Sequence, residues 1–162
     1  SRINNKLARA AAVTGTTVSY EGFDSTLTNI YAPGNGIGSV RKITGWTQLQ
    51  QIINTTSSGG DQQFLTYQLL EADSQNRIPT VKNPFDMTIE IADDPTLAGY
   101  ILASVANDDR LARGVKIVLA NGAFLYYNCY LSLNRIPTLT VNQLMSVTMT
   151  MSMLAEPTRY SS

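Results

Sequence analysis

One stretch decides the fold of this chain: residues 142–154, which read NQLMSVTMTMSML. Within it hydroxyl residues alternate with apolar residues: Ser146, Thr148, Thr150 and Ser152 against Val147, Met149, Met151 and Met153. A period of two predicts a long strand with one buried face and one wet face. A helix would bring residues three and four apart to one side and would mix the hydroxyls with the thioethers. The rest of the chain must therefore supply the apolar surface on which this strand packs.

Residues 85–91 predict a second strand of the same kind. The apolar side of this strand consists of Phe85, Met87, Ile89 and Ile91, and the polar side of Asp86, Thr88 and Glu90. Because both strands have one apolar side, we expect them to pair in one sheet.

Residues 115–120 and 123–133 predict a β-hairpin, because Asn121-Gly122 between them favours a tight hairpin turn. The longer strand carries Leu125, Tyr127, Cys129, Leu131 and Leu133 on one face, and Phe124, Tyr126, Asn128, Tyr130 and Ser132 on the other. Large aromatic side chains suit a surface that another subunit partly buries, so Phe124, Tyr126 and Tyr130 are candidates for a subunit interface. Tyrosine in a strand also occurs without any partner, which leaves the simpler explanation open.

One helix is predicted over about residues 95–107. We expect Asp94 to cap it, and Pro95 suits the first helical position because its missing N–H costs nothing there. An apolar stripe follows: Leu97, Ala98, Ile101, Leu102 and Val105. The stripe predicts that the helix lies on the sheet, with Leu102 and Val105 in the core.

The first half of the chain predicts less regular structure. Residues 1–12 are expected to form an N-terminal arm. The spacing of Ile3, Leu7 and Ala11 allows a short helix or an arm that orders only against a neighbour, and the simpler alternative is a frayed terminus. Residues 13–31 predict two short strands broken around residues 21–24, and residues 37–49 predict another strand.

Residues 54–84 are too long for an ordinary connection inside one domain. They begin with NTTSSGGD, which predicts an exposed loop tip, then include a candidate strand over residues 63–72 and an irregular end. The segment also carries apolar side chains that a free loop would expose to water: Phe64, Leu65, Tyr67, Leu69 and Leu70. We therefore predict a long loop or hairpin that acts between subunits. The alternative is that residues 63–72 form an ordinary core strand and only the tip is mobile.

A pentapeptide occurs twice, because residues 76–80 and residues 134–138 both read NRIPT. Proline ends strand pairing on its own side, so both copies are expected to mark where the chain enters a sheet. Two copies at this spacing do not make a repeat fold.

Composition excludes several classes of function. The 162 residues suffice for one domain with one core, and 12 basic residues balance 12 acidic ones, so no overall field attracts nucleic acid or an anionic membrane. The sequence has no histidine, which removes Ser-His-Asp and Cys-His catalysis and His-based zinc sites. The single cysteine, Cys129, permits no intrachain disulfide and is expected in the core.

No apolar run reaches the length of a membrane span, and the N-terminal residues lack the apolar core of a signal peptide. We therefore expect a soluble protein that is made for use inside a cell. A hydrolase would depend on the carboxylate pairs Asp93/Asp94 and Asp108/Asp109. Adjacent aspartates in a turn rarely face one another, and helix capping explains the first pair more simply.

The order of elements over residues 85–157 resembles the major tail tube proteins of long-tailed, non-contractile bacteriophages. The succession is an alternating strand, an Asp-Asp-Pro helix start, an apolar helix, a strand, the Asn-Gly turn, the aromatic strand, and the NQLMSVTMTM strand that closes on Glu156-Pro157. The resemblance implies a mainly β fold: a single-domain, two-sheet β-sandwich or barrel with one flanking helix. It also implies a structural virion protein without catalysis or cofactors, which forms six-membered rings stacked into a hollow tube.

The same resemblance implies location and partners. The protein would belong to the virion tail, assembled in the host cytoplasm. Its main partner would be itself, and the tape measure protein, the tail terminator and the tail-tip proteins would be further partners. DNA would pass through the lumen without specific binding, and no membrane would take part.

A conduit for DNA should be neutral to acidic inside, because each Lys or Arg that contacts phosphate adds affinity and slows passage. The polar sides of the two alternating strands are therefore the candidates for the lumen lining: Asp86, Thr88, Glu90, Ser146, Thr148, Thr150 and Ser152. The alternative function is a monomeric β-barrel that binds a small ligand, whose polar strand faces would line a cavity. A tube protein should elute as large assemblies, whereas a ligand barrel should elute near 17.7 kDa.

Overall fold

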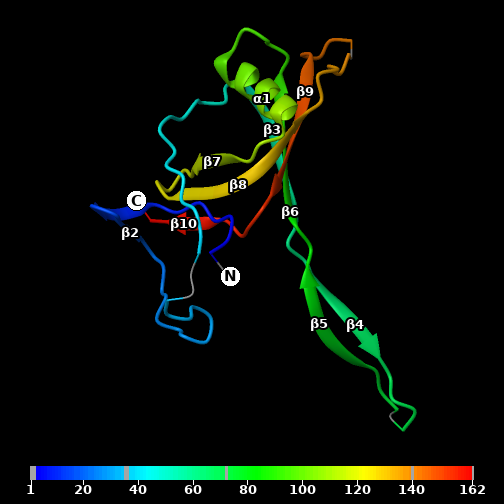
Figure 1. Cartoon of the computed structure of the whole chain (residues 1–162). Coiled ribbons are helices and arrows are strands. Elements are labelled where there is room, and N and C mark those ends of the chain that lie inside the picture. Colours follow the sequence, from blue (N-terminus) through cyan, green and yellow to red (C-terminus); the bar gives the residue numbers. More distant parts are fainter. Residues whose placement is uncertain (1–2, 35–36, 72, 140, 162) are drawn as a thin grey trace.

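Strand β9 (Ser146–Met153) lies inside a six-stranded antiparallel sheet, as its alternating pattern predicts. The computed structural model describes residues 3–34, 37–71, 73–139 and 141–161, so residues 1–2 of the predicted arm and residue 72 of the segment 54–84 lie outside it. The mainly β fold with a single helix is confirmed, and the main sheet curls into a half-barrel (Figure 1). The other elements are β1 (Ala10–Thr14), β2 (Thr17–Tyr20), β3 (Ile52–Gly59), β4 (Gln62–Tyr67), β5 (Asn76–Lys82), β6 (Phe85–Ala92), α1 (Ala98–Asp109), β7 (Arg113–Val118), β8 (Phe124–Leu133) and β10 (Thr158–Tyr160).

The main sheet has the strand order β10-β8-β9-β6-β3, with β7 on the free edge of β8. Strands β9 and β10 share the opposite edge of β8, each pairing with a different half of it. The two alternating strands β6 and β9 pair directly, which confirms the prediction that they belong to one sheet. Strands β1 and β2 form a separate ribbon, and β4 and β5 form another. Among the described residues, no helix is long and apolar enough to cross a membrane.

The core lies on the apolar side of β6, β8 and β9. Its members are Ile89, Ile91, Ala103, Tyr127, Cys129, Leu133, Val147, Met149 and Met151. The Tyr127 hydroxyl donates to the Met87 sulfur at 3.1 Å and also lies 3.5 Å from the Met151 sulfur. The methionine sulfurs thus accept the hydrogen bond of the hydroxyl that this ring brings into the core. Burial raises the pKa of Tyr127.

The hairpin between β7 and β8 forms around Asn121-Gly122, as predicted. Gly122 has a φ of 82°, a backbone conformation that glycine adopts without a Cβ penalty. The Asn121 side chain accepts a hydrogen bond from the Ala123 N–H at 3.1 Å, and the Gly122 N–H donates to the Leu119 carbonyl at 2.9 Å. The turn is therefore satisfied by its own residues.

Helix α1 begins at Ala98 rather than at Pro95, and Asp94 does not cap it. The Asp94 carboxylate instead accepts hydrogen bonds from the Thr96 N–H at 3.0 Å and the Thr96 hydroxyl at 2.6 Å. The predicted cap is wrong because a local turn satisfies this carboxylate before the helix begins.

The helix also packs through a different face from the one predicted. Its buried residues are Gly99, Ala103 and Ala106, whereas Leu102 is 43% exposed and Val105 is 49% exposed. The prediction that Leu102 and Val105 belong to the core is therefore wrong. Small residues let the helix axis approach its neighbours closely, and the larger residues are left on the outer side.

The N-terminal half departs most from the predictions. Residues 3–9 form a turn and an extended arm rather than a helix, and both short strands lie before residue 21. Residues 37–49, predicted as a strand, form no strand and run as an extended segment from the β10 side of the sheet towards α1 (Figure 1). Residues with a high strand propensity did not form a strand over 37–49, because no neighbouring strand pairs with this segment.

The segment 54–84 is a strand followed by a hairpin. The polar residues 54–59 are not a loop tip but belong to β3, which pairs with β6 along its length. Strands β4 and β5 then form a hairpin that extends away from the rest of the molecule (Figure 1). The alternative of an ordinary core strand over residues 63–72 is wrong, because β4 pairs only with β5 and its side chains are largely exposed.

The two NRIPT copies have different structures, and neither marks the start of a strand of the main sheet. The first copy lies within β5, where Pro79 is opposite Phe64. Proline is tolerated there because both strands of an isolated hairpin are edge strands. The second copy follows β8 as a loop, with one bridge from Thr138 to Ser146.

We predict that Gly99→Ala destabilises the protein, although alanine normally favours a helix by up to about 1 kcal/mol over glycine. A Cβ at Gly99 would lie 2.9 Å from the Gln48 carbonyl oxygen and 3.1 Å from the Leu49 Cα, so backbone must move. We expect a loss of about 1–3 kcal/mol in urea unfolding. Gly45→Ala is the control, because a Cβ there meets nothing within 4 Å. Equal or higher stability of Gly99→Ala would show that the helix does not rest on this segment.

We predict that Cys129 is unreactive in the folded protein. The residue is fully buried, burial raises the pKa of its thiol to about 11, and the thiolate is the reactive form. Ellman's reagent at pH 8 should therefore label the chain only after denaturant is added. Rapid labelling of the native protein would contradict the burial.

Candidate functional site

A polar face runs across the sheet on the side opposite the core. The register sets Asp86 opposite Ser152, Thr88 opposite Thr150, and Glu90 opposite Thr148. Directly opposed residues lie on the same face of a sheet, so the two strands bring these lumen-lining candidates together in one band. The Ser152 hydroxyl donates to the Asp86 carboxylate at 2.7 Å.

Ser146, the seventh candidate, differs from the other six because it is buried. Its hydroxyl donates to the Glu90 carboxylate, and its carbonyl accepts from the Thr138 N–H at 2.9 Å. Ser146 is therefore corrected from a lining residue to a residue that orients Glu90.

The polar face continues onto both neighbouring strands, which the sequence did not indicate. On β3 the residues opposite Glu90, Thr88 and Asp86 are Asn54, Thr56 and Ser58. On β8, Ser132 is opposite Thr150 and Tyr130 is opposite Ser152. The face therefore spans four strands with hydroxyls, one amide and two carboxylates, and none of these positions holds Lys or Arg. We call these residues, with the six exposed or half-buried candidates above, the polar face.

The chain itself covers the aromatic end of the same sheet side. The Tyr126 ring lies 6.1 Å from the Trp46 ring and 5.7 Å from the Tyr160 ring, between centroids. The Tyr160 hydroxyl accepts from the Arg9 N–H at 3.0 Å and donates to the Glu21 carbonyl at 3.1 Å. Phe124 and Tyr126 are thus half-buried within one subunit, so no second subunit is needed to explain them. Tyr130 remains 49% exposed.

Other apolar surfaces have no cover within the described part of the chain. The β4–β5 hairpin exposes the predicted interface residues Phe64, Leu65, Tyr67 and Leu69. The outer side of α1 exposes Ile101, Leu102 and Val105. The loop after β8 exposes Ile136, Leu139, Val141 and Leu144. Exposed apolar area of this extent is typical of protein interaction surfaces.

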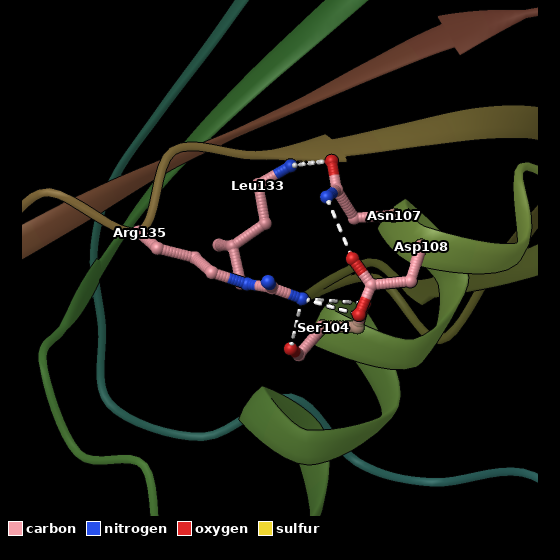
Figure 2. Close-up of polar contacts among 5 residues, drawn as sticks. All are labelled: Ser104, Asn107, Asp108, Leu133 and Arg135. Carbon is pink, nitrogen blue, oxygen red and sulfur yellow. Dashed lines mark hydrogen bonds and ion pairs between the residues drawn. The ribbon is translucent and has the colours of Figure 1, made fainter.

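A polar cluster fastens this loop to the end of α1 (Figure 2). The Arg135 guanidinium donates to the Asp108 carboxylate and to the Ser104 hydroxyl, both at 2.6 Å, and to the Ser104 carbonyl at 3.2 Å. The Asn107 side chain accepts from the Leu133 N–H at 3.0 Å. One arginine therefore holds the last turn of the helix and the exit of β8 together.

Among the paired aspartates, Asp94, Asp108 and Asp109 take part in structural contacts. Hydrogen bonds from Thr96 lower the pKa of Asp94, and the hydrogen bond from Arg135 lowers the pKa of Asp108. Asp109 forms an ion pair with Arg113. A hydrolytic acid needs a raised pKa, so these shifts run in the wrong direction for that role. The described residues also contain no group of three or more His, Cys, Asp or Glu side chains that could hold a metal ion.

The alternative of a ligand-binding barrel needs a sheet closed around a cavity. The main sheet is a half-barrel whose edge strands β3 and β7 do not pair with each other. Its polar face is therefore an open surface.

Comparison with known proteins agrees with the fold. A family model described as phage tail tube protein matches residues 1–162. The tail of an empty GTA particle, with C6 symmetry, has a TM-score of 0.54 and 9% identity, covering 68% of this chain and 83% of that one. The tube-terminating cap of an anti-feeding prophage has a TM-score of 0.41 and 13% identity, covering 76% of this chain and 97% of that one. No curated protein matches the sequence.

We predict that Arg135→Ala frees the loop after β8. Amide hydrogen exchange should become faster in residues 134–139 and in the last turn of α1, because the substitution removes every contact of the guanidinium. Arg77→Ala is a matched control: it is the arginine of the other NRIPT copy and has no side-chain partner among the described residues. Equal exchange in the two variants would show that the cluster does not hold the loop.

Proposed function

The chain belongs to the phage tail tube protein family, and from this we propose that its copies form six-membered rings that stack into a hollow tail tube through which DNA passes. The family is one of structural proteins and not of enzymes. The C6 symmetry of the similar GTA tail supports six copies in a ring.

The polar face is the observation that carries this proposal. Core residues and α1 cover the other side of β6, β8 and β9, whereas the described part of the chain leaves Thr148, Ser152 and the β3 residues Asn54, Thr56 and Ser58 exposed. A curled sheet with one covered side and one hydroxyl-rich side has the surface that a water-filled channel requires. We assign the polar face to the channel wall.

The charges on the polar face fit the passage of DNA. Asp86 and Glu90 repel phosphates, and no base lies among the polar-face positions to retain them. Each phosphate contact with Lys or Arg would release counterions and strengthen binding. A wall of hydroxyls and carboxylates keeps its hydration and leaves the duplex free to move.

Ring closure would also remove the exposed edges of the sheet. Strand β3 is exposed along its whole length and lies at one edge, while β7 lies at the other. Free strand edges favour uncontrolled pairing between molecules, and a closed ring of sheets has no such edge at its subunit boundaries. The exposed apolar residues on the outer side of α1 and on the β4–β5 hairpin would then be buried between subunits.

Location and further partners follow from the tail role. We place the protein in the virion tail, assembled in the host cytoplasm. Tail terminator, tail-tip and tape measure proteins would contact the two ends and the interior of the tube.

We predict that new bases on the polar face retain DNA. Thr56→Lys with Thr148→Lys adds two positive charges at exposed positions of the polar face, and purified tubes should then hold short duplex DNA in a salt-dependent manner. Wild-type tubes should not retain it. Cryo-electron microscopy of the wild-type assembly should show the polar face inside the tube.

Thr17→Lys with Ser19→Lys is the matched control, because it adds the same charge on the exposed strand β2. Retention equal to that of the polar-face variant would show that any added charge suffices. Tubes whose polar face lies on the outer surface would overturn the proposed channel wall.

A further inference from the structure

Two segments of opposite charge and matching apolar character have charged side chains that form no ion pair in the described part of the chain, and we propose that the two segments bind each other between copies. The hairpin tip, defined as residues 69–71 and 73, would dock on the basic strip, defined as residues 37–46, of a second copy. The inference rests on the proposed self-assembly and names the surfaces that carry it.

The hairpin tip is acidic and apolar. It contains Leu69, Leu70, Glu71 and Asp73, and no Lys or Arg occurs anywhere in residues 62–76. Leu70 is fully exposed and Leu69 is 59% exposed. The hairpin points away from the body of the molecule (Figure 1), so the described part of its own chain does not cover the tip.

The basic strip has the complementary composition. It reads IGSVRKITGW, and no Asp or Glu occurs anywhere in residues 25–60. Val40 is 67% exposed, and Arg41 and Lys42 are exposed beside it. Among the described residues, neither these two bases nor the two acids of the tip take part in an ion pair.

Two side chains near the end of the basic strip contact other parts of the same subunit. Ile43 lies so close to Gly114 that a Cβ added to this glycine would be 2.5 Å from the Ile43 Cδ1, and Trp46 packs against Tyr126. Between and before these anchors the backbone forms no hydrogen bond to other backbone groups in the described part of the chain. An extended, anchored segment with free backbone donors and acceptors can receive another segment at little cost in entropy.

The two surfaces occupy different parts of the subunit, so a contact from the tip of each copy to the strip of the next copy is heterologous. Contacts of that kind join copies without limit unless a rotation closes them, which suits an assembly that grows by stacking. A two-fold dimer would instead need each of two tips to reach the strip of the other copy at the same time. Opposite charges also set the register of the contact and raise the rate at which copies meet.

A charge exchange tests the pairing. Glu71→Lys with Asp73→Lys reverses the tip, and Arg41→Glu with Lys42→Glu reverses the strip. At low salt each reversal should raise the protein concentration needed for tube growth by about tenfold, and the two reversals combined should return it to within about threefold of wild type. Light scattering and negative-stain microscopy measure the tubes, and thermal melts check that each variant folds.

The rescue has a matched control. In this control the reversed tip is combined with Arg77→Glu and Arg159→Glu, which replace two exposed bases outside the strip. Its net charge equals that of the variant with both the tip and the strip reversed. Recovery of growth in this control, or no recovery with the reversed strip, would overturn the proposed pairing. A wild-type chain that forms neither rings nor tubes would overturn both this pairing and the proposed function, so the two failures are distinguishable.

Cross-linking gives an independent measurement. Chains with Leu70→Cys are mixed with chains with Val40→Cys and oxidised mildly, and buried Cys129 does not interfere. A disulfide requires Cα atoms within about 7 Å, so a mixed dimer should form in tubes and not in dispersed subunits. Ile136→Cys replaces Val40→Cys in the control, because Ile136 is an exposed apolar residue of another surface. A dimer with Ile136→Cys and none with Val40→Cys would move the docking surface to the loop after β8.

Discussion

Strands β6 and β9 pair so that polar residues face polar residues and apolar residues face apolar residues from Asp86 and Ser152 to Ile91 and Val147, and only the last pair, Ala92 and Ser146, is mixed. A slip of one residue would turn every side chain of one strand to the opposite face, with methionines in water and hydroxyls in the core. The core, the seat of α1 and the polar face all depend on this one register. The polar face on β3 and β8 extends it, because those strands follow the registers of their neighbours.

The second constraint is the closeness of α1 to the structure beneath it. Gly99, Ala103 and Ala106 allow the helix to lie against its neighbours, and Gly99 leaves no room for a Cβ beside Gln48. A consequence is that the larger apolar residues point outward. The exposed apolar side of α1 is therefore a surface available for assembly, as are the β4–β5 hairpin and the loop after β8.

The termini show how local contacts organise a chain with long irregular segments. Arg9 pairs with Glu21 and lies over the Tyr160 ring, whose hydroxyl bonds to the backbone of both Arg9 and Glu21. The N-terminal arm is thus fastened to the last strand of the sheet. Trp46 and Ile43 fasten the next segment at Tyr126 and Gly114. A few aromatic and ionic contacts hold in place residues that pair with no strand of the main sheet.

The sequence by itself determined the alternating strands β6, β8 and β9, the Asn121-Gly122 turn and six of the eleven residues of the polar face. These features depend on side-chain alternation and on turn geometry, both of which are local. Tertiary structure alone decided the buried face of α1, the burial of Ser146 against Glu90, and the place of residues 54–59 in the sheet. None of these three features has its environment set by local sequence. A helix face of small residues, a hydroxyl at the end of a strand and a run of Asn, Thr, Ser and Gly can each be buried, paired or exposed, and the neighbouring segment decides which.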